Sequence, residues 1–198
     1  MEEIDPLSID ASKSTGKTPF KTHVIEFFET FVVFLAIMVI IYSFIAQPHK
    51  VSGTSMYPTF HNGDYIITNK IGYRLNPPQR GQVIVFENPR DKSQDFIKRV
   101  IGLPGESVRV QNNHVYINGK VLNEPYLAPG ITTNPGPFLQ EGVDVVVPPG
   151  NYIAMGDNRP ASSDSRDWGF LTRSEVIGQV IIRYWPIDTA EIVVPAKY

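Results

Sequence analysis

The sequence predicts a mainly β protein with a single N-terminal transmembrane helix and a β-rich domain after it. One long, uncharged, apolar run occupies residues 31–46. Short apolar runs separated by turn residues then follow to the end of the chain, which is the pattern of short β-strands. The 17 prolines and 15 glycines supply the turns. A length of 198 residues suits one domain plus an anchor.

The N-terminal elements are a polar tail and an apolar helix. Residues 1–26 are rich in Ser, Thr, Lys and Pro, and we expect a disordered cytoplasmic tail. Residues 27–47 are expected to form the transmembrane helix, because about 20 apolar residues cross the hydrocarbon core. A secretory signal peptide has a shorter apolar core. A buried core helix is less favoured, because this segment is apolar on every face.

The distribution of lysines predicts the orientation of the helix. Lys13, Lys17 and Lys21 precede it, and only Lys50 follows closely. By the positive-inside rule, the N-terminus is cytoplasmic, and residues 48–198 form an extracytoplasmic domain on a single-pass protein. We expect the plasma membrane, and an organelle membrane of bacterial descent is the alternative.

Residues 48–198 are expected to be mostly strands. Asn112-Asn113 and Asn118-Gly119 predict hairpin turns. Thr172 and Glu175 have capping-box spacing, which predicts a short helical turn over residues 172–177. Residues 122–142 are rich in Pro and Gly and predict a short surface insertion. The expected strands are residues 65–70, 82–87, 95–101, 107–111, 114–117, 143–147, 152–154 and 180–184.

Charge and composition exclude several classes of function. The net charge is -2, so nothing suggests nucleic-acid binding, which requires a basic surface. The chain has no cysteine, which excludes disulfides, thiolate metal sites and a cysteine nucleophile. We expect no cofactor and no metal.

Three clusters carry residues that can do chemistry, and the first surrounds Ser55. Gly53 permits unusual backbone angles and the close approach of another chain. Pro58 stiffens the exit from the loop. Such a loop can present a hydroxyl and a backbone N–H to a carbonyl group. Serines in loops of this kind are more often turn formers.

The second cluster is the strand around Lys98. Phe96, Lys98 and Val100 share one face of this strand, so a cation lies among apolar side chains. A snorkelling lysine at an exposed edge is one interpretation. A desolvated lysine with a lowered pKa is the other, and it could act as a general base. His61, close to Ser55 in the sequence, is the competing base, although no Ser-His-Asp arrangement is evident.

The third cluster, residues 156–166, is dense in hydroxyl, carboxylate and guanidinium groups. A solvated surface loop is the simplest interpretation. A calcium loop is disfavoured, because Arg159 and Arg166 are interleaved with the acids and the order is not that of an EF-hand. Alternating acids and arginines indicate internal ion pairs that fix the loop.

Together these clusters resemble the type I signal peptidase family, also called the bacterial leader peptidase family. Residues 55–59 match the S-M-x-P-T block, 98–105 match K-R-V-x-G-x-P-G, and 156–166 match G-D-N-R-x-x-S-x-D-S-R. Residues 80–86 resemble the strand block between the first two. Four blocks in order behind an apolar span are a specific signal.

The resemblance implies a membrane-bound serine endopeptidase that uses a Ser/Lys dyad to remove N-terminal signal peptides from exported preproteins. Ser55 would be the nucleophile and Lys98 the general base. Ser162 would orient the lysine. The oxyanion site would use the backbone N–H of Ser55. The loop would be supported by three further side chains, Asp157, Asp164 and Arg166.

The family's second oxyanion donor is a serine two residues before the nucleophile in some members, and Gly53 stands there in this chain. Thr54 is an alternative donor, as are Ser52 and water. The shallow substrate pocket would be formed by Val51, Met56, Phe96 and Ile97. The implied partners are preprotein signal peptides and the lipid bilayer.

Two rival hypotheses differ in class. A self-cleaving repressor-type serine/lysine peptidase has a related catalytic fold, but it lacks the apolar span and the block at residues 156–166. A catalytically inactive, membrane-tethered β-domain would bind preproteins only. Intact Ser55, Lys98 and Ser162 count against the second hypothesis.

Overall fold

The computed structural model describes residues 20–198, apart from the side chain of Arg74. The chain forms two compact units, Met1–Val39 and Ile40–Tyr198. Most of the expected N-terminal tail lies outside the described residues, so its predicted disorder stays a prediction.

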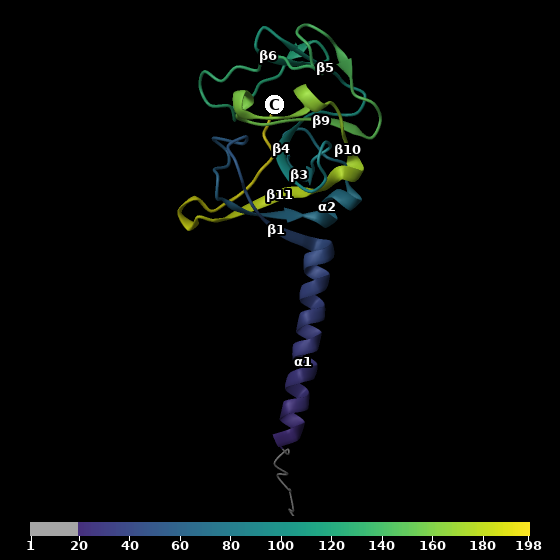
Figure 1. Cartoon of the computed structure of the whole chain (residues 1–198), viewed down its shortest axis with the longest axis vertical. Helices are drawn as coiled ribbons and strands as arrows, with labels where there is room; N and C mark the ends of the chain where they lie inside the picture. Colours follow the sequence, from purple (N-terminus) through teal and green to yellow (C-terminus); the bar gives the residue numbers. More distant parts are fainter. Residues whose placement is uncertain (1–19) are drawn as a thin grey trace, which may run out of the picture. The chain divides into compact units, whose positions relative to one another are not determined.

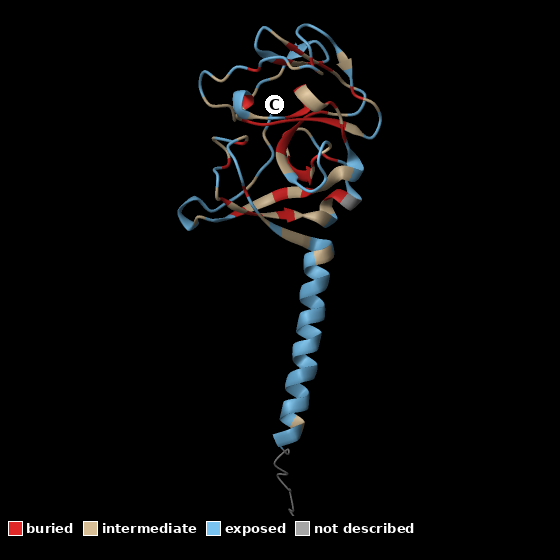
Figure 2. Cartoon of the chain, in the orientation of Figure 1, coloured by how far each residue is buried: buried red, intermediate tan, exposed pale blue. Residues whose placement is uncertain are grey.

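Helix α1, Phe20–Ile40, lies in the first unit up to Val39 and has no buried residue (Figures 1 and 2). A π-helical turn, Ile41–Ile45, continues it. Within residues 20–198, the stretch Phe20–Ile45 is the one helical segment long and apolar enough to cross a membrane. The helix begins before the expected residue 27, because its polar first turns are also helical. It ends before the expected residue 47, because the chain becomes a strand at Ala46.

The second unit consists of two antiparallel sheets (Figure 1). The large sheet has the order β1-β2-β11-β3-β4-β9-β10, and β12 pairs with β11; the small sheet has the order β7-β6-β5-β8. The large sheet comprises β1 (Ala46–Lys50), β2 (Tyr65–Asn69), β3 (Val83–Glu87), β4 (Asp95–Gly102), β9 (Asn151–Met155), β10 (Leu171–Thr172), β11 (Val176–Trp185) and β12 (Glu191–Ile192). The small sheet comprises β5 (Ser107–Gln111), β6 (His114–Ile117), β7 (Lys120–Val121) and β8 (Val145–Val146).

Short helical elements connect the strands: α2 (Lys70–Leu75), α3 (Ser165–Trp168) and the 3₁₀ turns Arg159–Ala161, Arg173–Glu175 and Ile187–Thr189. The predicted turn chemistry is confirmed. Asn112, Asn113 and Asn118 have positive φ, at 48°, 65° and 50°, and join β5 to β6 and β6 to β7. The capping box of Thr172 and Glu175 is present. The expected mainly β fold is therefore confirmed.

The buried core joins the two sheets through β4 and β9, whose buried residues are prominent in Figure 2. Ile101, Ile153 and Met155, from these strands, pack with the apolar residues of β5 and β6. Each fully buried aliphatic side chain contributes about 1.5–3 kcal/mol relative to exposure. Strand β4, which carries Lys98, is thus held in place by core packing between the two sheets.

Candidate active site

The loop that carries Ser55, residues 51–60 (the serine loop), is anchored by buried apolar side chains. Met56 and Phe60 are 1% and 0% exposed. The Val51 N–H donates to the Asp64 carbonyl over 2.8 Å. Gly53 has φ +96°, a conformation in which other L-residues are strained. The loop therefore has a fixed base, and Ser55 at its tip remains partly exposed.

Lys98 approaches Ser55 from strand β4. Its side chain is buried, at 3% exposure. The amine donates to Ser55 Oγ over 2.8 Å and to the Ile97 carbonyl over 3.0 Å. It also lies 5.0 Å from the centre of the Phe96 ring. The structure thus brings together the two residues for which the sequence predicted a joint role.

Burial lowers the pKa of Lys98 from 10.5 to about 8, because an ammonium group is poorly solvated in this environment. The carboxylates of Asp164 and Asp157 act in the opposite direction and raise the pKa, and Arg166 lowers it. A substantial fraction of the amine is consequently neutral in mildly alkaline solution, and a neutral amine can accept a proton.

The loop of residues 156–166 (the arginine loop) is held by buried ion pairs. Asp157 accepts from Arg99, the neighbour of Lys98 on β4, over 2.6 Å. Asp164 accepts from the Arg166 Nε over 2.8 Å and from the Gly156 N–H over 3.1 Å. The interleaved acids and arginines therefore fix the loop, as the sequence pattern indicated.

The arginine loop is also hydrogen-bonded to the serine loop. The Asn158 backbone N–H donates to the Ser55 carbonyl over 3.0 Å, and its side-chain amide donates to the Thr54 carbonyl over 3.1 Å. Thr59 donates to Asp157 over 2.5 Å. Sequence reasoning assigned no role to Arg99, Asn158 or Thr59. All three lie inside the matched blocks, but their partners are far away in the sequence.

Ser162 differs from the expectation. Its hydroxyl oxygen is buried and has no hydrogen-bond partner among the described residues. The expected hydrogen bond to Lys98 is not formed, because the Lys98 amine bonds to Ser55 and the Ile97 carbonyl instead. Ser162 nevertheless lies close, because a Cβ added to Gly156 would collide with both its hydroxyl and the Ser55 carbonyl.

A cleft of about 410 Å³ opens in front of Ser55 and Lys98. Val51, Phe96 and Ile97 line it, as expected for a substrate pocket. Met56 does not line the cleft, which corrects the sequence-based expectation. Its side chain packs instead into the core beneath the loop, because the loop's anchoring requires a buried residue there.

The expected oxyanion donors differ in their availability. The Gly53 N–H is occupied, since it donates to Asn62 Oδ1 over 3.0 Å. Neither the Ser55 nor the Thr54 backbone N–H makes a hydrogen bond within the described residues. These two groups are free to bind an oxyanion.

The competing base, His61, is exposed and packs against the Tyr57 ring at 5.2 Å between ring centres. It does not line the cleft. His49 does line the cleft, but its Nε2 is 3.2 Å from the Thr68 hydroxyl. The base in hydrogen-bond contact with Ser55 is therefore Lys98.

Comparison with known proteins shows the family to which the chain is similar. Residues 24–185 match the family model described as signal peptidase, peptidase S26. The chain is 39% identical over 184 residues to a probable signal peptidase I-2 of Synechocystis sp., covering 90% of this chain and 80% of that protein. It is 34% identical over 179 residues to signal peptidase IB of Staphylococcus aureus, covering 85% and 93%. A crystal structure of a signal peptidase I from Enterococcus faecalis is 36% identical, with a TM-score of 0.45, and covers 52% of this chain and 97% of that one.

These matches show that the protein is a serine endopeptidase. The chain belongs to the signal peptidase family, peptidase S26, and its reaction is the removal of signal peptides. The resemblance seen in the sequence blocks is confirmed.

Proposed function

We propose that the enzyme cleaves signal peptides from exported preproteins with Ser55 and Lys98 as a catalytic dyad. The observation that carries this proposal is the 2.8 Å contact between a buried, pKa-lowered amine and a serine hydroxyl in an open cleft. Neutral Lys98 takes the Ser55 proton as Oγ attacks the scissile carbonyl. It then returns the proton to the leaving amine.

The backbone N–H groups of Ser55 and Thr54 stabilise the oxyanion, because they carry no other hydrogen bond in the described part of the chain. Ser162 orients the lysine once substrate displaces the present contacts. Its buried, unpartnered hydroxyl supports this role, since such a group gains free energy from any hydrogen bond it forms.

The substrate binds as an extended strand between β1 and β4. Residues 95–98 of β4 pair with β3 on one side only, because β9 begins to pair at Arg99. Among the described strands, β1 pairs with β2 alone. Two free strand edges therefore flank the cleft, and an extended peptide can pair with either. Val51, Phe96 and Ile97 form the pocket for its small side chains.

The chain is organised as a cytoplasmic tail, a transmembrane helix and an extracytoplasmic catalytic domain, with the helix in the plasma membrane. The apolar, exposed segment Phe20–Ile45 supports the span. The absence of cysteine makes the topology testable by labelling of introduced single cysteines. Labelling from outside in the catalytic domain supports this orientation, and labelling there only after lysis contradicts it.

The dyad is tested by cleavage of a purified preprotein in detergent by wild type, Ser55→Ala and Lys98→Ala, with sequencing of the product N-terminus. We expect cleavage after a small-x-small site by wild type alone. Circular dichroism checks that both variants are folded. Efficient cleavage by folded Lys98→Ala would place the base elsewhere.

A further inference from the structure

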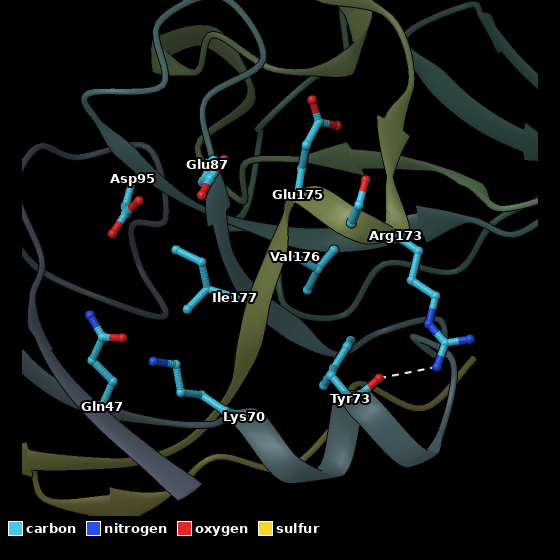
Figure 3. A pocket seen from close by; sticks show the side chains of 10 residues that line it. Gln47, Lys70, Tyr73, Glu87, Asp95, Arg173, Glu175, Val176 and Ile177 are labelled. Atoms are coloured by element: carbon cyan, nitrogen blue, oxygen red, sulfur yellow. Dashed lines mark hydrogen bonds between the residues drawn. The ribbon is translucent and has the colours of Figure 1, made fainter. Parts of the chain in front are cut away.

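A second cavity lies next to the catalytic cleft and has no role in the reaction described above. It has a volume of about 1020 Å³ and is lined by strands β1, β3 and β4, the 3₁₀ turn Arg173–Glu175, the start of β11 and helix α2 (Figure 3). Its charged lining residues are the acids Asp95, Glu87 and Glu175 and the bases Lys70 and Arg173. Asp95 lines both this cavity and the catalytic cleft. The two are therefore neighbouring parts of one surface, and we call the larger one the Asp95 cavity.

The strands that flank the cleft lead directly to the Asp95 cavity. Asp95 of β4 and His49 of β1 approach to 3.9 Å between carboxylate and imidazole, so the first strand of the sheet returns close to the fifth. Gln47, two residues before His49 on β1, lines the cavity. A peptide bound between the free edges of β1 and β4 must pass Asp95 when it leaves the cleft at this end.

The direction of the substrate decides which residues reach the cavity. Strand β1 begins at Ala46, directly after the apolar segment that ends at Ile45. The part of a signal peptide upstream of its cleavage site is held in the bilayer, so the upstream end of the bound peptide lies toward Gln47. Strands rise about 3.3 Å per residue, and Asp95 precedes Lys98 by three residues on β4. Upstream substrate residues thus enter the Asp95 cavity.

Charge sets the preference of the cavity at its cleft end. Asp95 is directly opposite Glu87 in the register of β3 and β4, and both carboxylates line the cavity. Like charges opposite each other destabilise a strand pair. Lys70, on the facing wall, donates to the Ser43 carbonyl over 3.4 Å. Figure 3 shows Asp95 and Lys70 on opposite sides of Gln47 and Ile177.

We propose that the Asp95 cavity is an upstream substrate subsite, which takes a side chain about four to six residues before the scissile bond and favours a basic over an acidic one there. This inference rests on the proposed function of the cleft. The ligand is a peptide segment of the preprotein, and Asp95 is its specificity-determining contact.

The test uses the full-length enzyme in detergent and three signal-peptide substrates with Lys, Gln or Glu at the fifth residue before the scissile bond. Cleavage of the Gln substrate by wild type and its loss in Ser55→Ala test the proposed function separately. The subsite is read from the ratio of kcat/KM for the Lys and Glu substrates, which cancels any general effect of a substitution on folding.

We expect the Lys/Glu ratio of kcat/KM to be above one in wild type. Asp95→Lys should reduce this ratio by roughly fivefold or more, because the substitution replaces an exposed attractive charge pair with the Lys substrate by a repulsive one. Lys70→Glu should raise the ratio. The wild-type preference should weaken in high salt, which screens charges. Asp188→Lys is the matched control, since it makes the same charge change at an exposed residue that does not line the cavity. An Asp95→Lys ratio equal to that of wild type or of Asp188→Lys would overturn the proposal.

Discussion

Lys98 and Arg99 are neighbours on strand β4 and are equally buried, at 3% exposure each, but only Arg99 has a carboxylate partner. Arg99 donates through two nitrogens to Asp157, over 2.9 and 2.6 Å. Lys98 has no salt bridge among the described residues and contacts a hydroxyl and a carbonyl instead. One strand thus keeps one cation charged and lets its neighbour become neutral.

The first prediction concerns the pH dependence of cleavage. Because burial lowers the pKa of Lys98 to about 8, the neutral fraction of the amine grows as the pH rises through that value. We expect kcat/KM to rise with pH around a midpoint near 8 and then level off, in assays with one peptide substrate. A midpoint near 6.5, the ordinary pKa of histidine, would contradict a lysine base.

The second prediction is that Lys98→Met stabilises the enzyme at neutral pH while abolishing cleavage. The pKa is 10.5 unfolded and about 8 folded, so burial of the charged amine costs about 3 kcal/mol below pH 8. The unfolded state binds more protons between pH 8 and 10.5, so the stability of wild type rises with pH over this window. The advantage of the Met variant should shrink there. Urea unfolding at pH 7 and 10 measures both, and equal stabilities at pH 7 would contradict the prediction.

The third prediction concerns the support of the arginine loop. Asp157→Ala leaves the Arg99 charge buried without a partner, which should lower the free energy of unfolding by about 3–5 kcal/mol. The control is Asp144→Ala, which breaks the exposed pair with Arg109 and should cost about 1 kcal/mol or less. Thermal unfolding of the two variants measures the difference. Similar losses of stability in both variants would show that the buried Arg99–Asp157 pair contributes no more to stability than an exposed pair.

The fourth prediction separates a catalytic from a structural role of Ser162. Its hydroxyl has no partner in the described structure, so Ser162→Ala should leave the unfolding temperature unchanged or slightly raised. If the hydroxyl orients Lys98 during the reaction, kcat should fall by about tenfold or more with little change in KM. Ser93→Ala, at an exposed residue that does not line the catalytic cleft, is the control. Unchanged kcat in Ser162→Ala would remove Ser162 from the mechanism.

Local sequence signals predicted much of the fold. Strands β5 and β6 match their expected bounds, because alternating apolar residues flank Asn-containing turns. Strand β1 was missed, since Pro48 and a neighbouring apolar helix are poor signs of a strand. Helix α2 was missed because it has only six residues and contains Gly72. Both elements depend on tertiary contacts rather than on a local pattern.

In the candidate site, too, some features could be predicted from local sequence and others depend on tertiary contacts. The residues Ser55 and Lys98 were identified from sequence blocks, and the structure brings them into contact. The partners of Arg99 and Arg159 were not predictable, because Asp157 and Glu124 lie 58 and 35 residues away in the sequence. Met56 was misplaced, because a pattern does not show whether an apolar residue lines a cleft or lies beneath it.

The insertion between β7 and β8 is fixed at both ends by arginine-loop residues. Arg159 binds Glu124 and Thr133, and the Phe138 N–H donates to the Arg166 carbonyl over 2.8 Å. Between these attachments, Pro129-Gly130 is exposed and has open space around it. Lengthening a flexible loop costs little, about 0.6 kcal/mol per doubling. This turn is therefore the place to graft an affinity tag or a fluorophore, where the label would report on the working enzyme without loosening its catalytic centre.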